Sequence, residues 1–219
     1  MLNIYKDMKT RYLIFAALIL FGFNLTAIGQ ISGTKHDFSG RSWAPLENKI
    51  CGVCHATHNA KSEPSAPLWN HQSTAVAAYD IYSSPTFDSH GGLTITIPSE
   101  SSKLCLSCHD GTVALENFGD ITTGTNYIPA ESRIGSSGDM RKEHPISFQY
   151  TDALATADGG LRPPTTTNSG LGGTIDNDML FNSKLECASC HDVHNKYNVS
   201  HLLKMSNINS QLCLTCHMK

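Results

Sequence analysis

The sequence predicts a mostly irregular, loop-rich fold with short α-helices and few strands. Three observations lead to this prediction. All eight cysteines of the 219-residue chain fall in four copies of one five-residue motif. Between Gly111 and Glu186, stretches such as Gly135-Ser-Ser-Gly138 and Pro163-Pro-Thr-Thr-Thr167 are typical of turns and loops. The polypeptide is also poor in the apolar periodicity that marks helices or strands with a buried face.

Each motif has the form Cys-x-x-Cys-His. In such a motif two thiols add across the vinyl groups of one porphyrin, and the imidazole takes an axial position on the iron. The four motifs therefore predict four covalently attached haem c groups. The attaching cysteines would be Cys51, Cys54, Cys105, Cys108, Cys187, Cys190, Cys213 and Cys216, and the iron ligands His55, His109, His191 and His217.

Paired cysteines have two other common uses, a structural zinc site and a redox dithiol or disulfide in an exported protein. Histidine makes up only 11 of 219 residues, so its recurrence after every pair favours haem. Four large apolar macrocycles would also replace a conventional hydrophobic core. The predicted architecture is a tetrahaem c-type cytochrome organised around a stacked haem chain.

Residues 1–29 have the features of a removable signal peptide. Lys6, Lys9 and Arg11 precede an apolar run from Tyr12 to Leu25, and small residues follow. The alternative is a membrane anchor, but the run is shorter than the roughly 20 residues that a bilayer span requires. The mature chain is expected to have no membrane span and to be exported, to the periplasm, the cell surface or beyond.

The net charge is −3 for the whole chain, and loss of the basic first segment would make the mature chain more acidic. This balance argues against a nucleic-acid partner, which needs a basic footprint. Other redox proteins or extracellular electron acceptors are the expected partners.

The motifs alternate between two types along the chain. Cys51–Asn59 and Cys187–Asn195 share Cys-x-x-Cys-His-x-x-His-Asn, here called type one. Leu104–His109 and Leu212–His217 share Leu-Cys-Leu-[Ser/Thr]-Cys-His, here called type two. This order is what duplication of a two-haem unit would leave. We expect a first two-haem unit at 30–120, a loop-rich connecting segment at 121–180 and a second two-haem unit at 181–219.

Few regular elements are expected within these units. A short helical turn should lie at each haem motif. A helix is expected at Ser73–Tyr82, and a short strand at Leu93–Ile97, where apolar residues alternate with threonine.

Seven histidines lie outside the motifs, more than the four needed to give every iron a second imidazole. His58 and His194 each follow a motif histidine by three residues, so they would ligate a neighbouring haem rather than their own. His71, His144 and His36 are the other candidate ligands. His90, before two glycines, and His201 are expected in surface or hydrogen-bonding roles.

Several segments together resemble the doubled-CXXCH multihaem cytochromes c. These are Lys35–Ser39, Cys51–Ala60, Pro67–His71, Leu104–Gly111, His144–Phe148 and Leu185–His194. Tetrahaem members of similar size include subunits of extracellular cytochrome nanowires. The resemblance implies bis-His irons and low helix content. In filament members a neighbouring subunit supplies a distal histidine, and His36 or His58 would do so in a homopolymer of this chain.

The leading functional hypothesis is an electron carrier without enzymatic activity, either a periplasmic shuttle or a filament subunit. A multihaem reductase would need one iron with an open position, which the surplus of histidines disfavours. A haem-stapled structural or adhesive protein is a third hypothesis.

Overall fold

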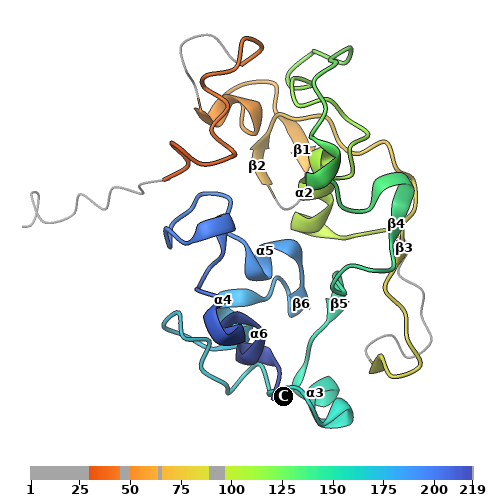
Figure 1. The fold of residues 1–219 in the computed structure, drawn as a ribbon, viewed down its shortest axis with the longest axis vertical. Coiled ribbons are helices and arrows are strands. Elements are labelled where there is room, and N and C mark those ends of the chain that lie inside the picture. Colours follow the sequence, from red (N-terminus) through yellow and green to blue (C-terminus); the bar gives the residue numbers. More distant parts are fainter. Residues whose placement is uncertain (1–29, 45–49, 64–65, 89–96, 219) are drawn as a thin grey trace, which may run out of the picture.

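The computed structural model describes residues 30–44, 50–63, 66–88 and 97–218, and the chain runs mainly through loops (Figure 1). The described part contains five short α-helices: α2 (Glu100–His109), α3 (Asp152–Asp158), α4 (Ile175–Met179), α5 (Cys187–Cys190) and α6 (Gln211–Cys216). Single 3₁₀ turns lie at η1 (Ile50–Val53), η3 (Ala130–Ser132), η4 (Ser136–Gly138), η5 (Ser200–Leu202) and η6 (Ile208–Ser210). The predicted irregular fold is confirmed.

The strands form only two-stranded sheets in the described part of the chain. Antiparallel pairs join β1 (Lys61–Glu63) to β2 (Ala66–Trp69) and β5 (Phe148–Gln149) to β6 (Lys184–Leu185). A parallel pair joins β3 (Asp80–Ile81) to β4 (Asp139–Met140). Strand pairs this short contribute little stability alone, so their main effect is to connect loops through backbone hydrogen bonds.

Two of the helices, α3 and α4, begin at a threonine that caps them. Thr151 accepts a hydrogen bond from the backbone N–H of Leu154 at 3.2 Å and starts α3, which ends at Gly159 with φ +69°. Thr174 starts α4 in the same way. Four of the helical elements, η1, α2, α5 and α6, coincide with the four Cys-x-x-Cys-His motifs. The helical turns expected at these motifs are therefore confirmed.

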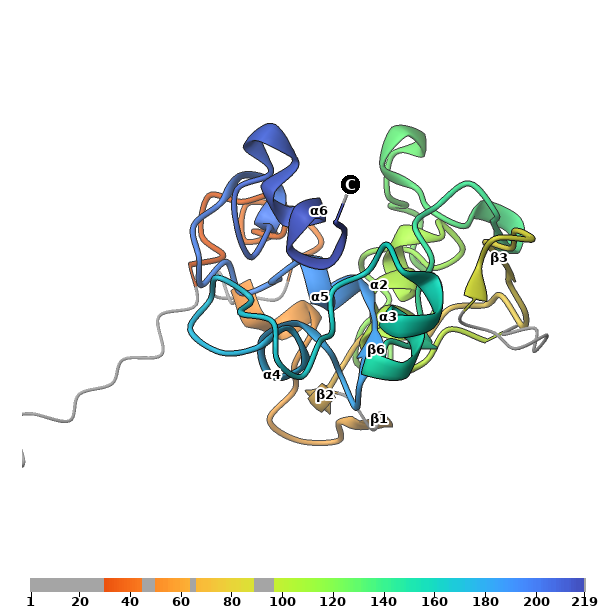
Figure 2. The ribbon, with the colours of Figure 1, turned by 90° about the horizontal axis from the view of Figure 1, so that it is seen from below.

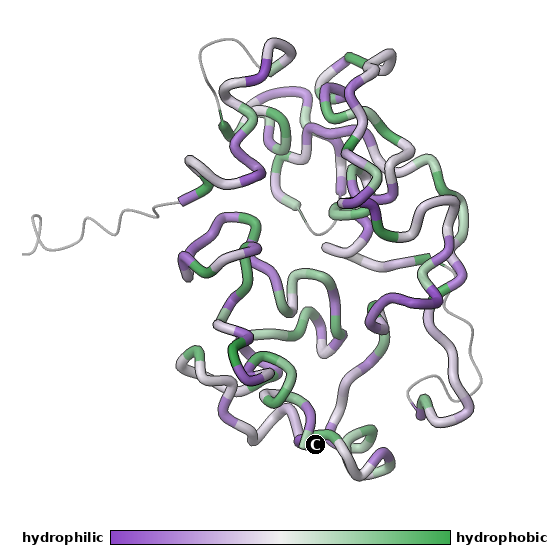
Figure 3. Tube along the Cα trace, in the orientation of Figure 1, coloured by the Kyte–Doolittle hydropathy of each residue, from purple (hydrophilic) through white to green (hydrophobic). Residues whose placement is uncertain are grey.

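The hydrophobic core joins side chains from both halves of the chain. Leu106 of α2 belongs to the same buried cluster as Ile175 and Met179 of α4 and Leu212 of α6. Helices α2 and α5 lie side by side near the middle of the molecule in both views (Figures 1 and 2). Hydrophobic and hydrophilic stretches alternate at short intervals along the trace (Figure 3), which is the pattern of a loop-built core. No described helix has the length and apolar character needed to cross a bilayer.

The predicted helix at Ser73–Tyr82 is wrong. This segment contains no helix: it runs through bends at Ala75 and Ala77 into β3. Thr74 accepts a hydrogen bond from the Val76 N–H at 3.0 Å, a local turn that competes with a helix. The hydroxyl groups of Thr74 and Tyr79 both donate to the buried carboxylate of Asp110. These tertiary hydrogen bonds override the helix propensity of the alanines in the segment.

Other predictions fall outside the described residues. The signal peptide at 1–29 and His90 lie there entirely, and the strand expected at Leu93–Ile97 lies there except for its last residue. Ile97 itself is exposed and not in a strand.

Candidate functional site

The first motif histidine is held by a short backbone segment, residues 67–70, here called the bracket of this motif. Nδ1 of His55 lies 2.8 Å from the carbonyl oxygen of Pro67. The N–H of Ala56 donates to the carbonyl of Leu68 at 2.9 Å, and the N–H of Asn70 donates to that of Cys54 at 2.9 Å. Strand β2 therefore runs antiparallel to the motif and fixes its imidazole.

The third motif repeats this bracket with a different part of the chain. Nδ1 of His191 lies 3.0 Å from the carbonyl oxygen of His201. The N–H of Asp192 donates to Leu202 at 2.7 Å, and that of Lys204 donates to Cys190 at 2.9 Å. Residues 201–204 thus take the place that residues 67–70 take at the first motif.

Matching positions at the first and third motifs also have the same backbone dihedral angles. Leu68 and Leu202, at matching places in the two brackets, have φ of +57° and +56°. Asn59 and Asn195, at the ends of the two type-one motifs, have φ of +56° and +54°. Positive φ is uncommon for leucine, so its recurrence marks a shared local fold. The repeat seen in the sequence is also a repeat of backbone conformation.

The type-two motifs are held by other segments. Nδ1 of His109 lies 3.1 Å from the carbonyl oxygen of Ser132. At the fourth motif, Arg162 N–H donates to Cys216 at 2.8 Å and Met218 N–H to Gly160 at 2.9 Å. The central segment therefore supplies the supports for both type-two motifs.

These carbonyl contacts fix which ring nitrogen carries the proton. A carbonyl oxygen can only accept, so Nδ1 of His55, His109 and His191 must donate and the lone pair lies on Nε2. Metal-bound histidines commonly have this arrangement, with one nitrogen on the metal and the other donating to an oxygen. The three imidazoles are thus in the form required to bind iron through Nε2.

Three further histidines face motif histidines. The ring centres of His36 and His109 are 6.0 Å apart, those of His55 and His194 are 6.2 Å apart, and those of His144 and His217 are 6.3 Å apart. An imidazole nitrogen binds a metal ion at about 2 Å, so two imidazoles on opposite faces of one iron have ring centres about 6 Å apart. The observed spacings fit a haem iron between each pair.

Burial favours the neutral form of two of these rings. Burial, with smaller contributions from the neighbouring His109 and His191, lowers the pKa of His36 to about 4. Nδ1 of His36 is buried without a hydrogen-bond partner. Burial also lowers the pKa of His217, as does the charge of His144. Neutral imidazoles are the metal-binding form.

The remaining predicted ligands are placed differently. His58 is exposed. His71 is fully buried against Trp69, with Nδ1 2.9 Å from the carbonyl oxygen of Gln72 and Nε2 3.1 Å from that of Ala114. The exposed ring of His201 contacts Ser200, while its carbonyl supports His191. Among the described residues, no second histidine ring faces His191.

All eight cysteines are described and carry free thiols. Burial raises the pKa of Cys54 to about 11, that of Cys108 to about 12 and that of Cys216 to about 11. Thiols kept apart from disulfides remain available for thioether bonds to a porphyrin. No group of three or more histidine, cysteine or acidic side chains in the described part is arranged to hold a bare metal ion.

The second and third motifs meet at a pair of thiols. A hydrogen bond between Cys105 and Cys187 raises the pKa of Cys105 and lowers that of Cys187. These two cysteines come from α2 and α5. The two halves of the chain are therefore in contact at their haem motifs.

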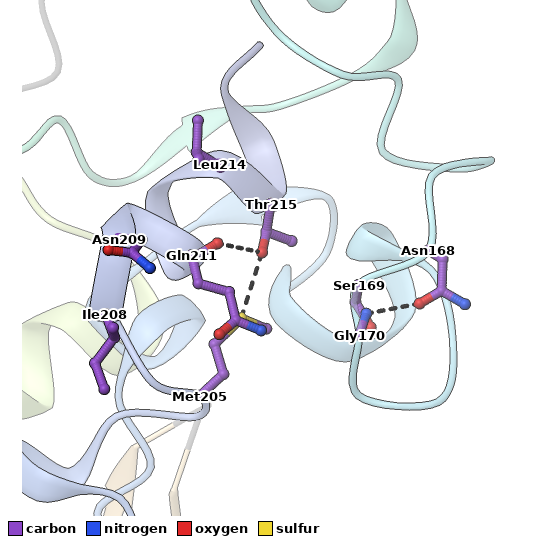
Figure 4. A pocket seen from close by; sticks show the side chains of 9 residues that line it. All are labelled: Asn168, Ser169, Gly170, Met205, Ile208, Asn209, Gln211, Leu214 and Thr215. Atoms are coloured by element: carbon purple, nitrogen blue, oxygen red, sulfur yellow. Dashed lines mark hydrogen bonds between the residues drawn. The ribbon is translucent and has the colours of Figure 1, made fainter. Parts of the chain in front are cut away.

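Two open hollows lie near the fourth motif. One, of about 570 Å³, is lined by His217 together with Gly160 and Asp158. The other, of about 510 Å³, lies on the side of α6 that carries Leu214 and Thr215 (Figure 4). There Thr215 donates to the sulfur of Met205 at 3.3 Å. The first hollow gives space beside the imidazole of His217, whereas no histidine or cysteine lines the second.

Comparison with known families bears on these motifs directly. Residues 180–219 match the family model for the doubled CXXCH motif. The match supports a multihaem type of cytochrome c. It covers the third and fourth motifs, and covalent haem c is the cofactor that such motifs indicate. A comparison with curated proteins found no match.

Sequence reasoning missed the backbone brackets. The carbonyl groups of Pro67, Ser132 and His201 orient the motif histidines, and no side-chain pattern marks them. One sequence signal could have pointed to the first bracket: Pro67-Leu-Trp-Asn-His71 follows a type-one motif closely and combines apolar residues with strand propensity.

Proposed function

We propose that this chain is an exported tetrahaem c-type cytochrome that carries electrons from haem to haem through bis-His irons. The spacing of the three histidine pairs supports this most strongly, because each pair couples a motif histidine to one from a distant part of the chain. A haem supplies reversible one-electron chemistry when it is bound. The chain supplies the attachment, the axial ligands and the burial.

The ligand pairs follow from the geometry and the repeat. His36 would complete the site of His109, His194 that of His55, and His144 that of His217. In both cases, a histidine that precedes a type-one motif faces the type-two motif that follows it. The same order along the chain therefore describes both pairs, although the sequences around His36 and His144 differ.

The fourth site, at His191, is assigned to His58. His194 of the second type-one motif faces His55 of the first. The reciprocal contact, His58 with His191, is the one that a symmetric exchange between the two motifs would make. His58 is exposed, so it can serve its own chain or a second copy. In the second case the exchange would link copies into an open polymer.

Two imidazoles on every iron favour electron transfer over catalysis. A ligand on each face leaves no position for a substrate, and it keeps ligation unchanged as the iron changes oxidation state. The proposed partners are therefore redox proteins or extracellular electron acceptors rather than a substrate to be transformed.

Electron paramagnetic resonance of the oxidised protein tests the proposal, together with a reversible redox titration. The proposal predicts only low-spin bis-His signals and full reduction and reoxidation of four haems. A high-spin signal that shifts when cyanide is added would instead identify an open iron and support a reductase.

A further inference from the structure

A buried carboxylate lies where the two halves of the chain meet. Glu186 directly precedes Cys187 and is 1% exposed. Its carboxylate accepts hydrogen bonds from the hydroxyl groups of Ser99 at 2.8 Å, of Ser147 at 3.0 Å and of Ser102. It also accepts the backbone N–H of Ser189 and so caps α5. An ionised carboxylate only accepts, which matches this set of donors.

The donors come from three separate segments. Ser99 and Ser102 belong to the start of α2, Ser147 directly precedes β5, and Ser189 lies within α5. Ser102 also accepts a hydrogen bond from the N–H of Cys187 at 2.9 Å. Glu186 therefore holds the helix of the second motif against the helix of the third.

The charge of Glu186 acts on a cysteine of each motif. The pKa of Cys105 is raised first by its hydrogen bond with Cys187 and by burial, and the negative charge of Glu186 raises it further. At Cys187 the hydrogen bond from Cys105 dominates and lowers the pKa, while the charge of Glu186 opposes that shift. A group attached at either motif would lie within reach of this negative charge.

The repeat provides an internal comparison. Ile50 stands before Cys51 of the first motif, at the position that corresponds to Glu186. The two type-one sites thus differ by one charge directly before the first cysteine. Because a nearby negative charge stabilises the oxidised, more positive iron, it lowers the reduction potential, and a buried charge acts more strongly than an exposed one.

We propose that Glu186 is a positioning and tuning residue that lowers the reduction potentials of the haems attached at the second and third motifs. The inference rests on the proposed electron-transfer function. Under this proposal, the haems at the contact between the two halves have the lowest potentials of the electron path. Glu186 sets these potentials without ligating either iron.

A redox titration followed by NMR, which resolves individual haems, tests this on the haem-loaded protein. Glu186→Gln keeps the shape of the side chain and removes the charge. We expect the potentials of the second and third haems to rise and those of the first and fourth to change less. Glu186→Asp, which restores the charge, should return them toward the wild-type values.

Glu116→Gln is the matched control. Glu116 is 8% exposed and accepts the N–H groups of Thr125 and Asn126 within its own loop. This variant should shift the reduction potentials of the second and third haems by less than half as much as Glu186→Gln does. An equal shift in both variants would overturn the proposal, because burial of any carboxylate would then account for it.

Ser147→Ala separates charge from packing. It removes one donor and leaves the charge of Glu186 less compensated, so the potentials should fall, opposite to Glu186→Gln. A rise or no change in these potentials would overturn the proposal, and this variant decides the question if Glu186→Gln does not fold.

If the wild-type protein titrates reversibly and Glu186→Gln leaves the potentials unchanged, this inference fails while the proposed function stands. If the wild type cannot be reversibly reduced, the proposed function fails.

Discussion

The imidazole of His55 lies nearly parallel to that of His194, with 16° between the ring planes and 6.2 Å between the ring centres. The two histidines belong to different repeats of the same motif. The second half of the chain therefore places a histidine beside the motif histidine of the first half, and under the proposed ligation the first iron site is not complete from local sequence alone. If His55 and His194 bind one haem as proposed, that iron site is complete only when the two halves are in contact.

Removing this contact should open one iron. We predict that His194→Ala converts one low-spin haem to high spin, since the ring facing His55 is lost and alanine supplies no ligand. Electron paramagnetic resonance measures the change. His201→Ala is the control, because the His201 ring is exposed and only its carbonyl supports His191. An unchanged spectrum in His194→Ala would contradict the pairing.

The N-terminal segment should matter in the same way. We predict that His36→Ala produces one high-spin haem, because His36 faces His109 at 6.0 Å. Carbon monoxide added to the reduced variant should bind one haem of the four. His71→Ala provides the comparison, since both nitrogens of His71 face backbone carbonyl groups. If His71→Ala opens an iron and His36→Ala does not, the ligand assignment is wrong.

His58→Ala tests the fourth site and the state of association together. We predict a high-spin haem at His191. The particle mass, measured by analytical ultracentrifugation, then shows whether His58 comes from the same chain or from another copy. A particle mass equal to that of the wild type places His58 within its own chain, whereas loss of a wild-type polymer shows that it crosses between copies. A fully low-spin spectrum would exclude His58 as the ligand.

The backbone brackets make a separate prediction about stability. Leu68 has φ +57°, in the left-handed region that is unfavourable for leucine, and it is 53% exposed, so its side chain is only partly buried. Leu68→Val should lower the free energy of unfolding by about 1 kcal/mol, because β-branched residues fit this region poorly. Leu68→Gly should leave stability unchanged or slightly higher. Denaturant unfolding of the haem-loaded variants measures both, and equal losses in the two variants would contradict this explanation.

The haem motifs and the short helices at them could be predicted from the sequence, because attachment chemistry fixes the residue types and their spacing. The loop-rich centre was predictable for a similar reason, since glycine and proline pairs define turns locally. In both cases the signal lies within a few neighbouring residues.

What could not be predicted depends on distant contacts. The segment at Ser73–Tyr82 contains alanines that favour a helix, yet hydrogen bonds from Thr74 and Tyr79 to Asp110 hold it in a non-helical conformation. The pairing of His36 with His109 joins residues separated by the whole first type-one motif. The carbonyl groups that orient the motif histidines belong to the backbone, which no residue type identifies. Helix propensity and motif spacing do not report on such contacts.

The most direct measurement is the intact mass of the protein, produced in cells that attach haem to c-type cytochromes. Addition of four haems to the mass of the processed polypeptide is the expected result, with the mass unchanged after denaturation in acid. A denatured mass equal to that of the bare polypeptide, or one with fewer than four haems, would contradict the proposal that every Cys-x-x-Cys-His motif carries a covalent haem.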